Sequence, residues 1–149
     1  MSTAGEIYIY SIHAGLALNI TCHPDHHGAV LIRAMEPEEG IPDMIRRRKR
    51  KKSKISQTWN SAEFRSLRTL TNGPSKLAEA LGIKKEWNRS VIGKYIVLLN
   101  RDTQPEITQS TRIGISASVD LPWRFCDRMS EFLSRPDAVK QLRKRNATR

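Results

Sequence analysis

Residues 29–44, AVLIRAMEPEEGIPDM, begin as an apolar strand that a charged side chain, Arg33, interrupts. Holding a guanidinium among aliphatic neighbours costs free energy unless the charge has a partner. The residues alone leave two kinds of partner open, because arginine binds carboxylates and phosphates with the same planar fork. One is a carboxylate of the following Glu-Pro turn, Glu36 or Glu38. The other is a phosphate.

Two further extended segments precede this strand. Residues 6–12, EIYIYSI, alternate apolar and polar side chains and are rich in aromatic and β-branched types, which favours a strand. Residues 16–22, LALNITC, continue as a second extended or bent segment, and residues 22–28, CHPDHHG, form a turn before the strand at 29–35. Because such short connections do not allow a parallel crossover, the pattern predicts an antiparallel hairpin.

Two segments have the features of helix starts. Residues 71–83, TNGPSKLAEALGI, offer a cap at Asn72 or Gly73, a proline suited to the first turn and a glycine that ends the helix. Residues 42–54, PDMIRRRKRKKSK, begin in the same way, but the basic run that starts at Arg46 has no apolar face. We expect that run to be exposed or disordered unless a polyanion orders it.

The remaining segments are predicted from shorter patterns. Residues 56–70 carry apolar side chains at a roughly helical spacing, and residues 90–100, SVIGKYIVLLN, are a strand candidate. Residues 111–118, TRIGISAS, are expected to form a short strand. Residues 119–126, VDLPWRFC, are expected to be extended because Pro122 does not fit a regular helix there.

Alternation within WRF assigns its side chains to two faces. Trp123 and Phe125 are expected in the core, with Arg124 between them on the opposite face. The chain length of 149 residues fits about one domain, which we place at residues 1–136, followed by a basic tail at 137–149.

The charge of the chain narrows the classes of partner. The formal net charge is +11 and the pI is about 10.2, so the surface attracts polyanions. Nucleic acid is the leading candidate because neutralising phosphates releases counterions. Ribosomal and membrane-surface proteins share this basic character, so a basic RNA- or ribosome-associated protein stays open as an alternative.

Cysteine usage and the lack of targeting features bear on location. Cys22 and Cys126 do not make a disulfide framework, which favours a reducing compartment. The N-terminus lacks a secretory signal pattern, and no apolar run approaches the roughly 18 residues of a membrane span. We expect an intracellular protein with no membrane partner, cytoplasmic and nucleoid-associated, or nuclear in a eukaryote.

Residues 22–27, CHPDHH, contain four potential metal ligands: Cys22, His23, His26 and His27. Their spacing matches no familiar zinc pattern, so turn residues are the preferred interpretation. We expect neither a metal nor a cofactor.

Other side chains have both structural and binding interpretations. Tyr8 and Tyr10 share one face of a strand, as core or binding aromatics. From the sequence alone, Asn19 is expected to be a turn or strand-end asparagine. Lys76 lies at a helix start, in GPSK, that is either simply capped or able to hold a phosphate.

Three separated blocks together resemble the 3-methyladenine (alkyladenine) DNA glycosylase family. The blocks are residues 5–20 with 29–40 (GEIYIYSIHAGLALNI and AVLIRAMEPEEG), residues 70–83 (LTNGPSKLAEALGI), and residues 112–125 with 132–136 (RIGISASVDLPWRF and FLSRP). The resemblance implies a single α+β domain with a curved antiparallel sheet flanked by helices. It also implies a monomeric repair enzyme that hydrolyses the N-glycosidic bond of alkylated purines in double-stranded DNA, with water as the nucleophile.

The resemblance carries roles onto five side chains. Tyr10 matches a tyrosine that stacks on the flipped base, which suits a cationic alkylated purine that cannot be cut inside the duplex. Asn19 matches an asparagine at the pocket floor that excludes guanine by crowding its amine. His13 falls where the family carries an intercalating wedge. Arg33 and Lys76 are expected to contact the DNA backbone.

The family's general base has no counterpart that we can name. In the family a glutamate lies in an E-x-E-A-Y strand upstream of the tyrosine block, whereas here only MSTAGEI precedes Tyr8, as though the family's N-terminal portion were absent. Glu6 aligns with no catalytic position, and Glu36, Glu38 and Glu39 belong to the Glu-Pro turn. The catalytic residue is therefore unknown, and a non-catalytic DNA-binding remnant of the family is an open alternative.

Overall fold

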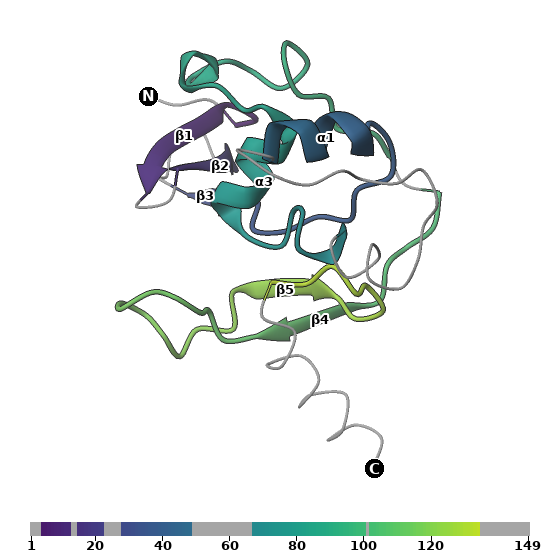
Figure 1. The fold of residues 1–149 in the computed structure, drawn as a ribbon. Coiled ribbons are helices and arrows are strands. Elements are labelled where there is room, and N and C mark those ends of the chain that lie inside the picture. Colours follow the sequence, from purple (N-terminus) through teal and green to yellow (C-terminus); the bar gives the residue numbers. More distant parts are fainter. Residues whose placement is uncertain (1–3, 13–14, 23–27, 49–66, 101, 135–149) are drawn as a thin grey trace.

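The computed structural model describes residues 4–12, 15–22, 28–48, 67–100 and 102–134. It contains a three-stranded sheet with helices packed on it and a separate two-stranded sheet below them (Figure 1). The elements are β1 (Ile7–Ile12), β2 (Gly15–Thr21), β3 (Ala29–Leu31), α1 (Ile41–Arg48), α3 (Pro74–Leu81), the 3₁₀ helix η1 (Lys85–Trp87), β4 (Ile107–Ser110) and β5 (Arg124–Asp127). The prediction of an α+β fold with antiparallel sheet is confirmed.

The first sheet has the order β1-β2-β3 and is antiparallel throughout, as the hairpin pattern predicts. Ile9 pairs with Leu18 on the buried face, whereas Tyr8 pairs with Asn19 on the other face. Alternation along β1 therefore separates an apolar face that packs inward from a face that carries the tyrosines.

The third strand is shorter than predicted. β3 ends at Leu31, although the Ile32 N–H still donates to the Leu18 carbonyl at 3.0 Å. Arg33 therefore lies just beyond the strand rather than within it. Ending the ladder before Arg33 spares the sheet an unpaired charge, because the side chain can turn towards polar partners.

Helix α3 covers the apolar face of this sheet by packing against β2. Gly73 caps its start, Pro74 lies in the first turn, and Gly82 ends it with φ of 69°, which suits a residue without a Cβ. The Ile83 N–H closes the end by donating to the Ala78 carbonyl at 2.8 Å. The resulting core consists of Ile7, Ile9, Leu18, Leu77, Ala78 and Ile83.

Helix α1 takes in the start of the basic run and packs against α3. Arg47 Nη1 donates to the Ala80 carbonyl at 3.0 Å, and Arg48 Nη1 contacts Glu79 Oε2 at 2.7 Å. The prediction of an exposed run is confirmed for Arg47, which nevertheless binds one of the last carbonyls of α3, where helical partners are lacking and cations are attracted. It holds only in part for Arg48, whose side chain is 26% exposed and pairs with Glu79. The rest of the run lies outside the described residues.

Two predicted strands are absent from their segments. Residues 90–100 contribute one bridge, Glu6 with Val91, and then fold back in a turn where the Gly93 N–H donates to the Ile96 carbonyl at 2.7 Å. Strand β4 ends before residue 111, and the chain bends where Gly114 has φ of 72°. Apolar composition alone does not make a strand where no neighbouring strand pairs with it.

The second sheet reverses the expected faces of β5. Trp123 is 61% exposed and Phe125 60%, whereas Arg124 is only 7% exposed. The guanidinium is buried because Ser134 and Ser110 accept its hydrogen bonds, which satisfies the polar group inside the protein.

Within the described ranges, no helix combines the length and apolar character of a membrane span. The predicted helix at 56–70 and the tail at 137–149 lie almost wholly outside these ranges.

Candidate nucleic-acid interface

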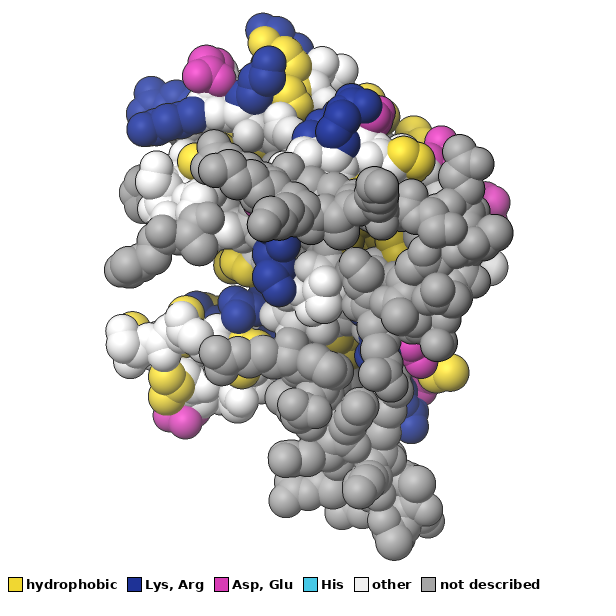
Figure 2. All heavy atoms as spheres, viewed as in Figure 1, with side chains coloured by type: hydrophobic (Ala, Val, Ile, Leu, Met, Phe, Trp, Pro, Cys, Tyr) yellow, Lys and Arg dark blue, Asp and Glu magenta, His cyan; other side chains and the backbone are white. Residues whose placement is uncertain are grey.

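Two adjoining cavities lie between the first sheet and the β4–β5 sheet. The larger cavity is about 740 Å³ and the smaller about 530 Å³. Figure 2 shows this region as a hollow with hydrophobic side chains on both sides and Lys or Arg side chains at its back. Both cavities are lined by Val30, Leu31, Arg33, Arg124 and Phe125.

The smaller cavity has one wall from each sheet. Tyr10 and Asn19 line it from β1 and β2, and Arg33 lines it just after β3. Arg112 and Trp123 face them from the second sheet and its loop. The structure thus brings together three of the five predicted site residues and adds a cation and an aromatic ring from far along the chain.

Tyr10 lies on the sheet face opposite α3. Its ring centroid is 5.5 Å from that of Tyr8, and the two ring planes are tilted by 34°. Tyr10 is 38% exposed and Tyr8 is 47% exposed. The prediction that the two rings share a face is confirmed, and neither ring belongs to the core. Of the two tyrosines, Tyr10 lines the smaller cavity and Tyr8 does not, so the exposed face of the Tyr10 ring can accept a planar group.

Asn19 is buried in the middle of β2 rather than at a turn or strand end. It pairs with Tyr8 on one side and with Leu31 on the other. Its Nδ2 donates to the Tyr8 carbonyl at 3.2 Å, which holds the amide in one orientation. A fixed amide at the base of a cavity can select a ligand by shape and hydrogen bonding.

Arg33 reaches away from the sheet towards the C-terminal part of the described chain. Its Nε donates to Ser134 Oγ at 2.8 Å, and Ser134 is 5% exposed. Glu36 is one of the two carboxylates that the sequence offers as a partner for Arg33. In the structure its carboxylate accepts a hydrogen bond from Ser130 Oγ at 3.2 Å. Arg33 lies where the two cavities meet, so its guanidinium can contact an anionic ligand in either.

Lys76 lies elsewhere, in the first turn of α3. Its Nζ donates to Asn72 Oδ1 at 3.0 Å, and neither cavity is lined by it. The start of α3 lies beside the end of the β1–β2 hairpin, where a Cβ at Gly15 would be 3.5 Å from Ser75 Cβ. His13 lies outside the described residues.

Sequence reasoning missed two features of this site. Arg112 places its guanidinium 5.3 Å from the centre of the Trp123 ring and donates to the carbonyls of Ala117 and Ser118 at 3.0 Å each. Arg124 was expected on the face opposite the core, but it is buried and lines both cavities. The alternation of WRF separated Arg124 from the two aromatic side chains, although it did not say which face is inside.

Acidic and metal-binding side chains are distributed unevenly. Among the described residues that line the smaller cavity there is no Asp or Glu, whereas Glu36, Glu38, Asp102 and Asp127 line the larger one. The parts of the chain that the structure describes hold no group of three His, Cys, Asp or Glu that could bind a metal ion. Three of the four potential ligands in CHPDHH lie outside those parts.

Comparison with known proteins matches this chain to one family. The family of methylpurine-DNA glycosylases matches residues 1–131. A relative from Rhizobium etli is 38% identical over 133 residues, which are 89% of this chain and 59% of the relative. A relative from Chlorobium luteolum is 42% identical over 125 residues, 80% of this chain and 57% of the relative. Both relatives bear the provisional name 3-methyladenine DNA glycosylase, and the chain spans less than two thirds of their length.

Proposed function

The chain belongs to the methylpurine-DNA glycosylase family, and on this premise we propose that it takes an alkylated purine, flipped out of double-stranded DNA, into the smaller cavity. The observation that carries the proposal is that Tyr10, Asn19 and Arg33 line this one cavity. Each of the three suits a different part of a nucleotide: an aromatic face for the base, an amide for its edge and a cation for the phosphate. Family membership also disfavours the alternative of an RNA- or ribosome-associated protein.

The reaction we propose is hydrolysis of the N-glycosidic bond. The bond between the sugar C1′ and the purine nitrogen breaks, and the alkylated purine leaves with the electron pair, which neutralises its positive charge. A water oxygen bonds to C1′ and releases a proton. Because a cationic purine is already a good leaving group, the chain has mainly to hold the nucleotide outside the stack and to position water.

Tyr10 supplies the stacking surface in this proposal. A half-exposed ring at the cavity wall attracts a cationic purine more strongly than an ordinary base, because the aromatic face is electron-rich. Asn19, held by the Tyr8 carbonyl, disfavours the extra amine of guanine at the floor of the cavity. Selection therefore comes from the charge of the ligand and from exclusion by shape.

We propose two backbone contacts, one at the cavity and one away from it. Arg33 binds a phosphate next to the flipped nucleotide, and Lys76 binds a phosphate further along, at the start of α3. His13 is proposed to fill the gap that the flipped nucleotide leaves. The protein acts as a monomer at the chromosome in this proposal, and its mass in solution by light scattering tests that part.

Binding tests the proposal first. The lesion duplex carries one alkylated purine on a 2′-fluorinated sugar, which resists hydrolysis, and is compared with the undamaged duplex by fluorescence anisotropy at fixed salt. We expect Tyr10→Ala to lower affinity for the lesion duplex by about tenfold, since stacking contributes roughly 1–3 kcal/mol per base. Tyr10→Phe keeps the ring and should bind like the wild type. Tyr8→Ala is the matched control, because Tyr8 lies on the same face outside the cavity.

Turnover is tested separately. Protein in excess is mixed with DNA that has been treated with a methylating agent, and released methylpurines are separated by chromatography. Release of free base supports hydrolysis by this chain. Tight binding of the lesion duplex without any release would overturn the enzymatic part of the proposal and leave its binding part standing.

A further inference from the structure

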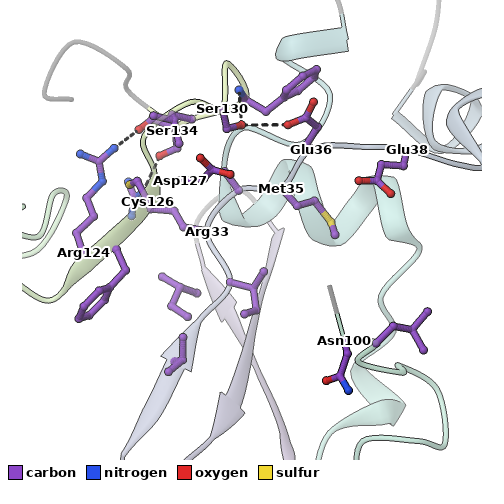
Figure 3. Close-up of a pocket in the computed structure, with 18 of the residues that line it drawn as sticks. Arg33, Met35, Glu36, Glu38, Asn100, Arg124, Cys126, Asp127, Ser130 and Ser134 are labelled. Atoms are coloured by element: carbon purple, nitrogen blue, oxygen red, sulfur yellow. Dashed lines mark hydrogen bonds between the residues drawn. The ribbon is translucent and has the colours of Figure 1, made fainter. Parts of the chain in front are cut away.

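Ser134 accepts a hydrogen bond from Arg33, although the two residues are 101 positions apart in the chain. Arg33 Nε donates to Ser134 Oγ at 2.8 Å, and Figure 3 shows Ser134 between the side chains of Arg33 and Arg124. Because a guanidinium is planar, a hydrogen bond from Nε fixes the plane of the group and with it the direction of the two terminal nitrogens. Ser134 therefore helps to fix the direction of the Arg33 side chain.

Ser134 is itself held from its other side. Its carbonyl oxygen accepts a hydrogen bond from Arg124 Nη2 at 2.7 Å, and Arg124 Nη1 reaches Ser110 Oγ at 3.5 Å. Arg124 is 7% exposed and Ser134 is 5% exposed, so both are excluded from water. The hydroxyl and the carbonyl of one buried serine thus connect Arg33, beyond β3, to Arg124 in β5.

The loop of the second sheet limits Arg33 from a third direction. A Cβ at Gly114 would lie 3.6 Å from Arg33 Nη2, in van der Waals contact, and the φ of 72° there disfavours any side chain. The loop backbone therefore passes beside the guanidinium. Gly114 belongs to the RIG motif, to which the proposed function gives no role.

We propose that Ser134, held by Arg124, is a positioning residue that orients Arg33 towards the DNA backbone at the junction of the two cavities. This inference rests on the proposed function, in which Arg33 binds a phosphate. An arginine that is already oriented loses less side-chain freedom on binding, so the bound state is favoured without any new contact to DNA. Ser134 acts through Arg33 and does not itself contact the nucleotide.

The decisive variant is Ser134→Ala, which removes the hydroxyl but keeps the carbonyl that Arg124 binds. We expect its affinity for the lesion duplex to fall by about tenfold, as for the loss of a hydrogen bond to a charged group. Ser134→Thr keeps the hydroxyl and should restore most of the affinity. If Ser134→Ala fails to fold, Ser134→Cys keeps the size of the side chain and replaces the hydroxyl with a weak acceptor.

A double-mutant cycle separates positioning from a general structural effect. If Ser134 acts through Arg33, Ser134→Ala added to Arg33→Ala should weaken binding no further than Arg33→Ala alone. Additive losses in the double variant would overturn the inference. So would an Ser134→Ala protein that binds like the wild type.

Failure of the inference and failure of the proposed function give different results. If Arg33→Ala itself binds the lesion duplex like the wild type, the phosphate contact of the proposed function is wrong. If Arg33→Ala weakens binding and Ser134→Ala or Ser134→Cys does not, the proposed function stands and the positioning role is wrong.

Discussion

The two sheets of this protein are stabilised in different ways. The β1–β3 sheet buries Ile7, Ile9 and Leu18 beneath α3, whereas the β4–β5 sheet exposes Trp123 and Phe125. The second sheet instead buries polar groups, with the guanidinium of Arg124 hydrogen-bonded to Ser134 and Ser110. The β1–β3 wall of the smaller cavity is thus stabilised by an apolar core. The β4–β5 wall is stabilised by a few hydrogen bonds and presents its aromatic side chains to the cavity.

The largest effect is expected in the apolar region. Leu77 is fully buried beneath the sheet, so Leu77→Ala should lower the free energy of unfolding by about 2–5 kcal/mol through lost burial and a cavity. Leu99→Ala is the control, because Leu99 is 85% exposed and its truncation should change stability little. Urea unfolding followed by far-UV circular dichroism measures both. Equal losses in the two variants would contradict the contrast.

A smaller effect is expected where the second sheet depends on a hydrogen bond. Arg124→Met keeps the apolar length of the side chain but leaves the buried Ser134 carbonyl without its donor, which should cost about 1–3 kcal/mol of stability. Arg128→Met is the control, because Arg128 pairs with the half-exposed Glu106 and should cost less than about 1 kcal/mol. Hydrogen exchange of β4 and β5 amides reports where protection is lost.

The exposed aromatic side chain of the second sheet should matter for binding more than for folding. Trp123→Ala is expected to weaken binding of the lesion duplex by about 1 kcal/mol, the lower end of the range for a ring that contacts a base. Its midpoint of urea unfolding should stay close to that of the wild type, because the ring is 61% exposed. Unchanged affinity together with reduced stability would show that this wall is structural.

The smallest effect is expected between the two helices. Arg48→Gln removes the ion pair with Glu79 Oε2 and should lower stability by less than about 1 kcal/mol, since both side chains are partly exposed. The loss should shrink further at high salt, because salt screens exposed pairs. Arg46→Gln is the matched control on the more exposed face of α1. Unfolding midpoints at two salt concentrations check both.

The elements that local patterns predict are those whose boundaries have local causes. Alternation predicts β1, the extended segment that follows it corresponds to β2, and the Gly-Pro start and the final glycine predict α3 within a residue. The apolar run at 90–100 has the composition of a strand, but within the described residues it forms one bridge, from Glu6 to Val91, and then folds back. Composition favours extended backbone, whereas pairing depends on a partner elsewhere in the chain.

The candidate site divides in the same way. Alternation predicts that Tyr8 and Tyr10 share a face, and in WRF it predicts that the two aromatic side chains share one too. A period of two does not say which face is inside, so the interpretation of Trp123, Phe125 and Arg124 was inverted. Which face is buried depends on residues elsewhere in the chain that pack against the strand, here Ser110 and Ser134.

By itself the sequence determined the first hairpin, the capped helix, the basic charge and the resemblance to a family, because these follow from neighbouring residues and their order. The tertiary structure alone decided that Arg33 bonds to Ser134, that Arg124 is buried and that Trp123 faces the cavity with Tyr10. The physical reason is that a buried polar group must find its partner wherever the chain brings one, and that partner lies here 101 residues away.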